Sequence, residues 1–130
     1  MNKLLNEARK NKADEFYTQY TDIENELAHY DESLFNGKTV YCPCDDWKTS
    51  QFARYFMTNF QRLGLKSLVS TCFVQDGCGI RYDYDGKRGV ATDLIFDGDF
   101  RGLDCELIRA SSDIVVTNPP FSSFRNIVEW

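Results

Sequence analysis

The chain is 130 residues long, with 42% hydrophobic and 15% aromatic side chains and a formal net charge of −5. This length and composition predict one folded domain, and they exclude both a two-domain and a disordered chain. No run of about 18 apolar residues occurs, which excludes a membrane-spanning helix, and the polar start lacks a signal peptide, so we expect a cytoplasmic protein. The acidic balance argues against a general nucleic-acid clamp, because phosphate contacts need a basic surface.

The N-terminal part of the sequence predicts helix. Residues 3–12 form a short polar lead, and the apolar side chains that follow recur at helical steps of four and three, at Phe16, Tyr20, Ile23, Leu27 and Tyr30. A turn at Asn36-Gly37 then separates this helical segment, 1–36, from the rest of the chain.

The next part predicts a β-α-β unit. Residues 38–42 form a short buried strand that ends at Pro43, and Asp45-Asp46 can cap the following helix. That helix has one apolar face and ends at Gly64, and 65–70 form a second strand. This is the unit from which parallel sheets are built.

The remaining elements complete an α/β pattern. Residues 80–87 and 90–95 read as a hairpin insertion turned at Asp85-Gly86, and 96–100 as a short strand end or loop. A helix over 103–110, a strand over 113–117 and a helix over 124–130 follow. We therefore expect an α/β fold with a mostly parallel, incomplete sheet of about four core strands in residues 37–130.

Five cysteines, an odd number, predict reduced thiols and no disulfide framework. Cys42 and Cys44 form the only close pair, and Cys72 and Cys78 are the further ligands that one can imagine. Their spacing matches no common zinc pattern, so the sequence predicts no metal site.

Polar segments follow three of the predicted strand ends. They are Pro43-Cys44-Asp45-Asp46, Asp97-Gly98-Asp99 and Thr117-Asn118-Pro119-Pro120-Phe121. Ligands of open α/β sheets bind at the carboxyl ends of strands, so these segments are predicted to line one cleft. Their carboxylates can accept hydrogen bonds from ribose hydroxyls, an adenine amine or an ammonium group.

The Asn118–Phe121 segment is the most specific of the three. The side-chain oxygen of Asn118 and the main-chain carbonyl of Pro119 can both accept a hydrogen bond from one amino group, and the two prolines stiffen the loop. Phe121 offers a ring face for stacking, worth about 1–3 kcal/mol per base. This chemistry suits an exocyclic amine on a flat base.

These residues resemble a known family. Thr117–Phe121 after an apolar strand is similar to the catalytic motif of S-adenosyl-L-methionine-dependent amino-methyltransferases, and Asp14–Thr18 resembles their N-terminal cofactor-contacting motif. Together with Val40–Asp46 and Asp97–Arg101, nearly the whole chain resembles the EcoRI-type adenine-specific DNA methyltransferases. The resemblance implies a Rossmann-like methyltransferase sheet and N6-adenine methylation of DNA in a restriction-modification system.

The resemblance also implies roles for individual residues. Cofactor contacts fall at Phe16, Tyr17, Thr18, Tyr41, Cys42, Pro43, Asp45, Asp99, Phe100 and Asn118, with Asp99 at the adenine amine of the cofactor. The catalytic residues are Asn118, Pro119, Pro120 and Phe121, with Phe121 stacked on a flipped-out adenine. The acceptors aim the target amine at the methyl group and stabilise its developing charge.

Several alternatives stay open at this point. Phe16 and Tyr17 can be core residues alone, Asp45 can simply cap a helix, and Asp99 can be a solvated turn residue. The segment after the second strand lacks the acid that commonly binds the ribose, with Asp76 as the candidate substitute. The runner-up functions are an RNA guanine-N2 methyltransferase and a non-catalytic binding or assembly module that retains the fold.

The family resemblance bears on how complete the domain is. A methyltransferase sheet of this type has about seven strands, so we expect 1–130 to be one methyltransferase domain truncated at its C-terminal side. Strand 113–117 would then be an uncovered apolar edge that invites self-association. We expect DNA contacts to come largely from regions absent here, and the chain to be inactive alone.

Overall fold

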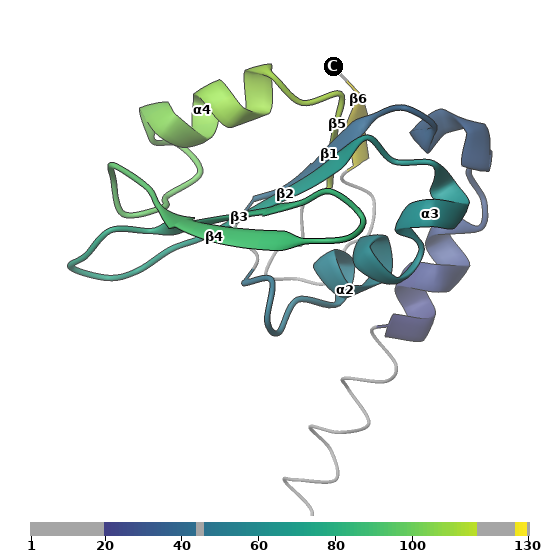
Figure 1. Cartoon of the computed structure of the whole chain (residues 1–130), viewed down its shortest axis with the longest axis horizontal. Helices are drawn as coiled ribbons and strands as arrows, with labels where there is room; N and C mark the ends of the chain where they lie inside the picture. Colours follow the sequence, from purple (N-terminus) through teal and green to yellow (C-terminus); the bar gives the residue numbers. More distant parts are fainter. Residues whose placement is uncertain (1–19, 44–45, 117–126, 130) are drawn as a thin grey trace, which may run out of the picture.

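The computed structural model describes residues 20–43, 46–116 and 127–129. They form one six-stranded sheet of order β4-β3-β2-β1-β5-β6 (Figure 1). The strands are β1 (Thr39–Cys42), β2 (Ser67–Cys72), β3 (Ile80–Tyr84), β4 (Gly89–Asp93), β5 (Ile114–Val116) and β6 (Ile127–Glu129). The central strands β2, β1 and β5 are parallel, and β3, β4 and β6 join antiparallel.

Helices cover both faces of this sheet. A helix runs through 20–27, and η1 (Glu32–Phe35), α2 (Gln51–Thr58), α3 (Phe60–Leu63) and α4 (Leu103–Ala110) follow. Figure 1 shows α4 over one face and α2 with α3 on the other. No helix in the described ranges is long and apolar enough to cross a bilayer.

Successive side chains of the central strands point to opposite faces of the sheet and contribute to two apolar cores. Val40 and Leu68 point to the side of α2 and α3, where they join a core with Phe56 and its neighbours. Tyr41 and Val69 point to the other side, into a core with Cys105, Ile108, Leu94 and Val115. Strands buried on both faces are typical of a parallel sheet with helices on each side, as the β-α-β pattern predicts.

Gly64 ends α3 with a φ of 68°, as expected. The cap of α2 is not Asp45-Asp46, as predicted, but Ser50, whose hydroxyl accepts a hydrogen bond from the Ala53 amide at 3.1 Å. In the hairpin, Asp85 Oδ1 accepts from the amides of Lys87 and Arg88 at 2.9 and 2.8 Å. This hairpin is confirmed, but its turn spans 85–88 instead of two residues, and it extends the sheet beside β2.

Two predictions for the C-terminal part are wrong. Residues 127–129 form strand β6, where a helix over 124–130 was expected. Ile127 and Val128 are β-branched, which favours a strand. Because β6 pairs with β5 along Ile114–Val116, β5 has a neighbour on both sides and is not an uncovered edge. The predicted self-association through strand 113–117 loses its basis.

One close contact places the Asp97–Asp99 segment at the end of β2. The amides of Val74 and Gly79 donate to the carbonyl oxygens of Asp97 and Phe96, each at 2.8 Å. Gly98 has a φ of 90°, and a Cβ at this position would lie 2.2 Å from the Cys72 carbonyl oxygen. Only glycine therefore lets the two segments approach this closely.

We predict that Gly98→Ala destabilises the fold more than Gly37→Ala does. Gly37 also has a positive φ, 71°, but a Cβ there would meet nothing within 4 Å. Both variants share the backbone strain, and only Gly98→Ala adds the overlap with β2. We expect an additional loss of about 1–3 kcal/mol in the free energy of unfolding measured by urea denaturation. Equal losses in the two variants would show that the close approach does not constrain the fold.

Candidate functional site

The carboxyl ends of the three parallel strands β1, β2 and β5 lie side by side, and the term edge below refers to this end of the sheet. Cys42 at the end of β1 pairs in register with Ser70 of β2, and Tyr41 pairs with Val115 of β5. Of the three polar segments that the sequence singles out, Pro43–Asp46 follows β1, Thr117–Phe121 follows β5 in the sequence, and Asp97–Asp99 lies beside the end of β2 without following it. In open α/β sheets this edge is where ligands bind, so it is the candidate site.

The residues at the end of β1 are buried in the protein core. Tyr41 is 1% exposed, and its hydroxyl shares a hydrogen bond with the Thr71 hydroxyl at 2.8 Å. Cys42 points into the opposite core, and Pro43 is also buried. In this arrangement the main chain, rather than the side chains, is the part of these predicted cofactor residues that a ligand at the edge can reach.

The loop between β1 and α2 is held against the hairpin. Trp47 stacks on Tyr82 of β3, with ring centroids 4.1 Å apart and planes at 11°. Asp46 accepts from the Lys48 amide through Oδ1 at 3.0 Å, and its carbonyl accepts from the Ser50 amide at 2.7 Å. The sequence analysis missed Trp47. A large aromatic directly after the predicted cofactor loop was the available signal.

Asp46 also lies near the end of β2. Partial burial raises the pKa of the Cys72 thiol, and the Asp46 carboxylate raises it further. Because an electrostatic effect of this kind requires proximity, the loop after β1 and the end of β2 form one polar environment. Asp46 is therefore an acid near the end of β2. Asp76, the substitute for the ribose-binding acid that the sequence offered, lies exposed in the loop after β2 with a φ of 56°.

Asp99 is the best-defined charged group of the site. The Arg101 guanidinium donates to both of its carboxylate oxygens, at 3.1 and 2.8 Å, and the Arg101 amide donates to Oδ1 at 3.0 Å. These hydrogen bonds lower the pKa of Asp99 to about 2, so that it is ionised at neutral pH. Phe100, beside it, is half exposed. A carboxylate has about four acceptor positions, so it retains capacity for a further donor.

Two buried oxygen atoms have no hydrogen-bond partner in the part of the chain that the structure describes. They are Gln51 Oε1 and Ser70 Oγ. Gln51, 6% exposed, is the first residue of α2 and lines a cavity of about 270 Å³ with Lys48 and Met57. Buried polar groups are normally paired, so an orphan acceptor at this edge indicates a missing donor. The signal in the sequence was a glutamine placed directly after the helix cap.

Several predicted site residues lie outside the described residues. They are Phe16, Tyr17, Thr18, Asp45, Asn118, Pro119, Pro120 and Phe121. What the structure does describe is the strand that leads to the last four. β5 runs parallel to β1 and ends at Val116, at the same edge as Cys42. The roles given to all of these residues stay predictions.

The sequence model of the family described as adenine-specific methyltransferase EcoRI matches residues 4–95 and 84–130. The chain is also 47% identical to the Type II methyltransferase M.EcoRI of Escherichia coli, over 98% of this chain and 44% of that protein. It is 42% identical to M.MpnI of Mycoplasma pneumoniae and 39% identical to M.MgeORF184P of Mycoplasma genitalium. Those alignments cover 95% and 96% of this chain and 39% of each relative. No solved structure matches.

The chain thus spans less than half the length of these relatives. Its family assignment does not depend on that share, because the family match extends over nearly all of its own residues. The chain belongs to the EcoRI family of adenine-specific methyltransferases.

Proposed function

We propose that this chain is the cofactor-binding part of a cytoplasmic, N6-adenine-specific DNA methyltransferase of a restriction-modification system. The observation that carries the proposal is the convergence of three elements at one sheet edge. The loop after β1, the Asp97–Asp99 segment beside β2, and the end of β5 before Asn118 meet there. In this proposal 1–130 are one Rossmann-like domain with a helical segment, 1–36, and an α/β core, 37–130.

The residues at the edge suit S-adenosyl-L-methionine. Asp99 is an ionised acceptor for the amine of the cofactor's adenine, and Phe100 offers an apolar ring beside it. The buried, unpartnered Gln51 oxygen suits the ammonium of the methionine part, and Asp46 suits the ribose hydroxyls. Phe16, Tyr17 and Thr18 complete the methionine side. When bound, the cofactor supplies an electrophilic methyl group.

The transfer itself needs positioned acceptors. The Asn118 side-chain oxygen and the Pro119 carbonyl accept hydrogen bonds from the two N–H groups of the target amine and direct its lone pair toward the methyl group. Positive charge develops on that nitrogen, and the two oxygens stabilise it. Pro120 keeps the loop rigid, and Phe121 stacks on the adenine outside the duplex.

DNA binding belongs mostly to the remainder of the family protein. The chain carries a net charge of −5 and spans less than half of the relatives' length. The three relatives are all named Type II methyltransferases, which favours DNA over RNA as the substrate. A non-catalytic module that keeps the fold differs from this proposal in one measurable property, cofactor binding.

We predict that calorimetry detects S-adenosyl-L-methionine binding to the 1–130 chain and that Asp99→Asn weakens it at least tenfold. Hydrogen bonds to charged groups contribute about 1.5–3 kcal/mol, and the variant loses the charge of the acceptor. Asp83→Asn is the matched control, because Asp83 is also paired with an arginine two residues away but lies in the middle of β3, opposite Val69. If the wild-type chain fails to bind the cofactor, the non-catalytic module is the better description.

A second prediction concerns activity. We expect purified 1–130 to transfer no methyl group to DNA. The assay uses tritium-labelled S-adenosyl-L-methionine and a mixture of DNA duplexes that together contain every possible short recognition sequence. Phosphate contacts need basic groups, and the net charge of −5 disfavours binding of the DNA backbone to this chain alone. Transfer of label to adenine by this chain would contradict the assignment of DNA binding to the remainder of the protein.

A third prediction follows from the Asp99–Arg101 pair. Asp99 has a pKa lowered from 3.8 to about 2, so the pair is fully formed above about pH 4 and is lost as pH falls through about 2. Arg101→Gln should return the Asp99 pKa toward 3.8, observed in a carboxyl-carbon NMR titration. Arg81→Gln, which removes the partner of Asp83, should leave Asp99 unchanged. An Asp99 pKa that is the same with and without Arg101 would refute the pairing.

A further inference from the structure

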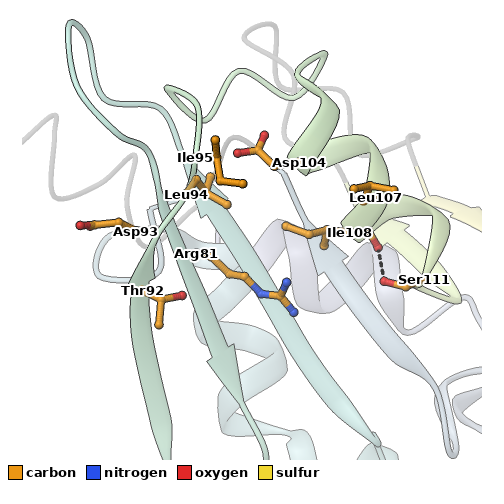
Figure 2. A pocket seen from close by; sticks show the side chains of 9 residues that line it. All are labelled: Arg81, Thr92, Asp93, Leu94, Ile95, Asp104, Leu107, Ile108 and Ser111. Carbon is orange, nitrogen blue, oxygen red and sulfur yellow. Dashed lines mark hydrogen bonds between the residues drawn. The ribbon is translucent and has the colours of Figure 1, made fainter.

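A groove opens between the hairpin and α4, next to the Asp97–Asp99 segment, where the Phe96 amide donates to Asp104 Oδ2 at 3.0 Å. Its volume is about 480 Å³. Figure 2 shows Arg81 reaching from β3 toward α4, with Leu94 and Ile95 beyond it and Leu107 and Ile108 on the helix. The proposed function uses none of these side chains.

Helix α4 is apolar on two faces. Cys105 and Ile108 are buried against the sheet, while Leu103 and Leu107, one turn apart, are 60% and 63% exposed. Ile95, across the groove from Leu107, is 81% exposed. A surface helix normally has one apolar stripe, so a second stripe indicates a second packing partner. Exposed apolar residues clustered around a groove mark an interaction surface.

The shape favours a polypeptide over a small molecule. The volume lies within the range of small-ligand pockets, but the apolar surface continues out of the groove along Leu107 and Leu103 instead of enclosing it. The groove carries two acidic groups, Asp93 and Asp104, and one basic group, Arg81, which is already paired with Asp83. A segment with apolar side chains facing α4 and a Lys or Arg beside these acids would complement it.

The length of the relatives indicates which polypeptide covers this surface. This chain spans 44% of M.EcoRI and 39% of the two Mycoplasma relatives, so more than half of each relative has no counterpart here. We propose that the surface formed by Ile95, Leu103, Leu107 and the groove is where an amphipathic segment from that remaining part of the family protein packs. This inference rests on family membership and not on cofactor binding.

The probe is the part of the E. coli relative that has no counterpart in this chain, co-expressed with 1–130 so that the two polypeptides can fold together. Sedimentation velocity should show a one-to-one complex. Leu107→Glu and Ile95→Glu should each weaken the complex at least tenfold, because a charge would be buried in an apolar contact. Val90→Glu is the matched control, because Val90 is 46% exposed on β4 and does not line the groove.

Three outcomes would overturn the proposal. The first is no complex between the two polypeptides. The second is a complex whose dissociation constant is the same for the Leu107→Glu, Ile95→Glu and Val90→Glu variants. The third is a homodimer of 1–130 that Leu107→Glu dissolves, because a second copy would then be the occupant. Circular dichroism melts of all three variants check that each stays folded, and cofactor calorimetry on the same samples keeps this test separate from that of the proposed function.

Discussion

The central constraint in this molecule is the position of β1 between two parallel neighbours. β1 pairs with β2 on one side and with β5 on the other, so three carboxyl ends share one edge. Burial on both faces holds this arrangement, with Val40 in one core and Tyr41 in the other. The polar loops that follow the strands cannot be fully buried, because their backbone groups need partners. They therefore gather at the edge and form a site there.

The hairpin and the segment after it hold further residues close to these strand ends. The hairpin occupies the place beside β2, and the Trp47–Tyr82 stack connects it to the loop after β1. The return from β4 then passes so close to β2 that only Gly98 fits. As a result Asp99, which is distant in sequence from the loop after β1, lies at the same end of the sheet. The Arg101 guanidinium donates to its carboxylate and favours its ionised form.

Much of this architecture was readable in the sequence because it depends on local signals. Pro43 ends β1, Gly64 ends α3, and alternating or helical apolar patterns mark the elements between them. The cap of α2 was assigned to Asp45-Asp46 instead of Ser50, because several capping residues precede the helix and the sequence does not show where its first turn begins. The pairing of β6 with β5 was not readable. A short β-branched stretch such as Ile127-Val128 has no helix or strand preference strong enough to decide, and the outcome depends on the long-range partner.

The same limit applies to the site. The resemblance of Asn118–Phe121 and Asp14–Thr18 to family motifs identified the family, which the comparisons confirm. Sequence alone predicted a buried strand over 38–42, but it did not show that the Tyr41 hydroxyl already shares a hydrogen bond with Thr71, because that partner comes from another strand. Nor did it show that the Gln51 side-chain oxygen is buried with no hydrogen-bond partner among the described residues, since hydrogen-bond partners are set by the three-dimensional structure.

The central claim is that the cofactor binds at the carboxyl edge of β1 and β2. Amide NMR of the 1–130 chain titrated with S-adenosyl-L-methionine tests it most directly, since each residue reports its own surroundings. The account predicts shifts concentrated at residues 43–51, 72–74 and 97–101, with α4 and β4 unchanged. Shifts concentrated instead at α4 and the hairpin, around Leu107 and Ile95, would contradict it.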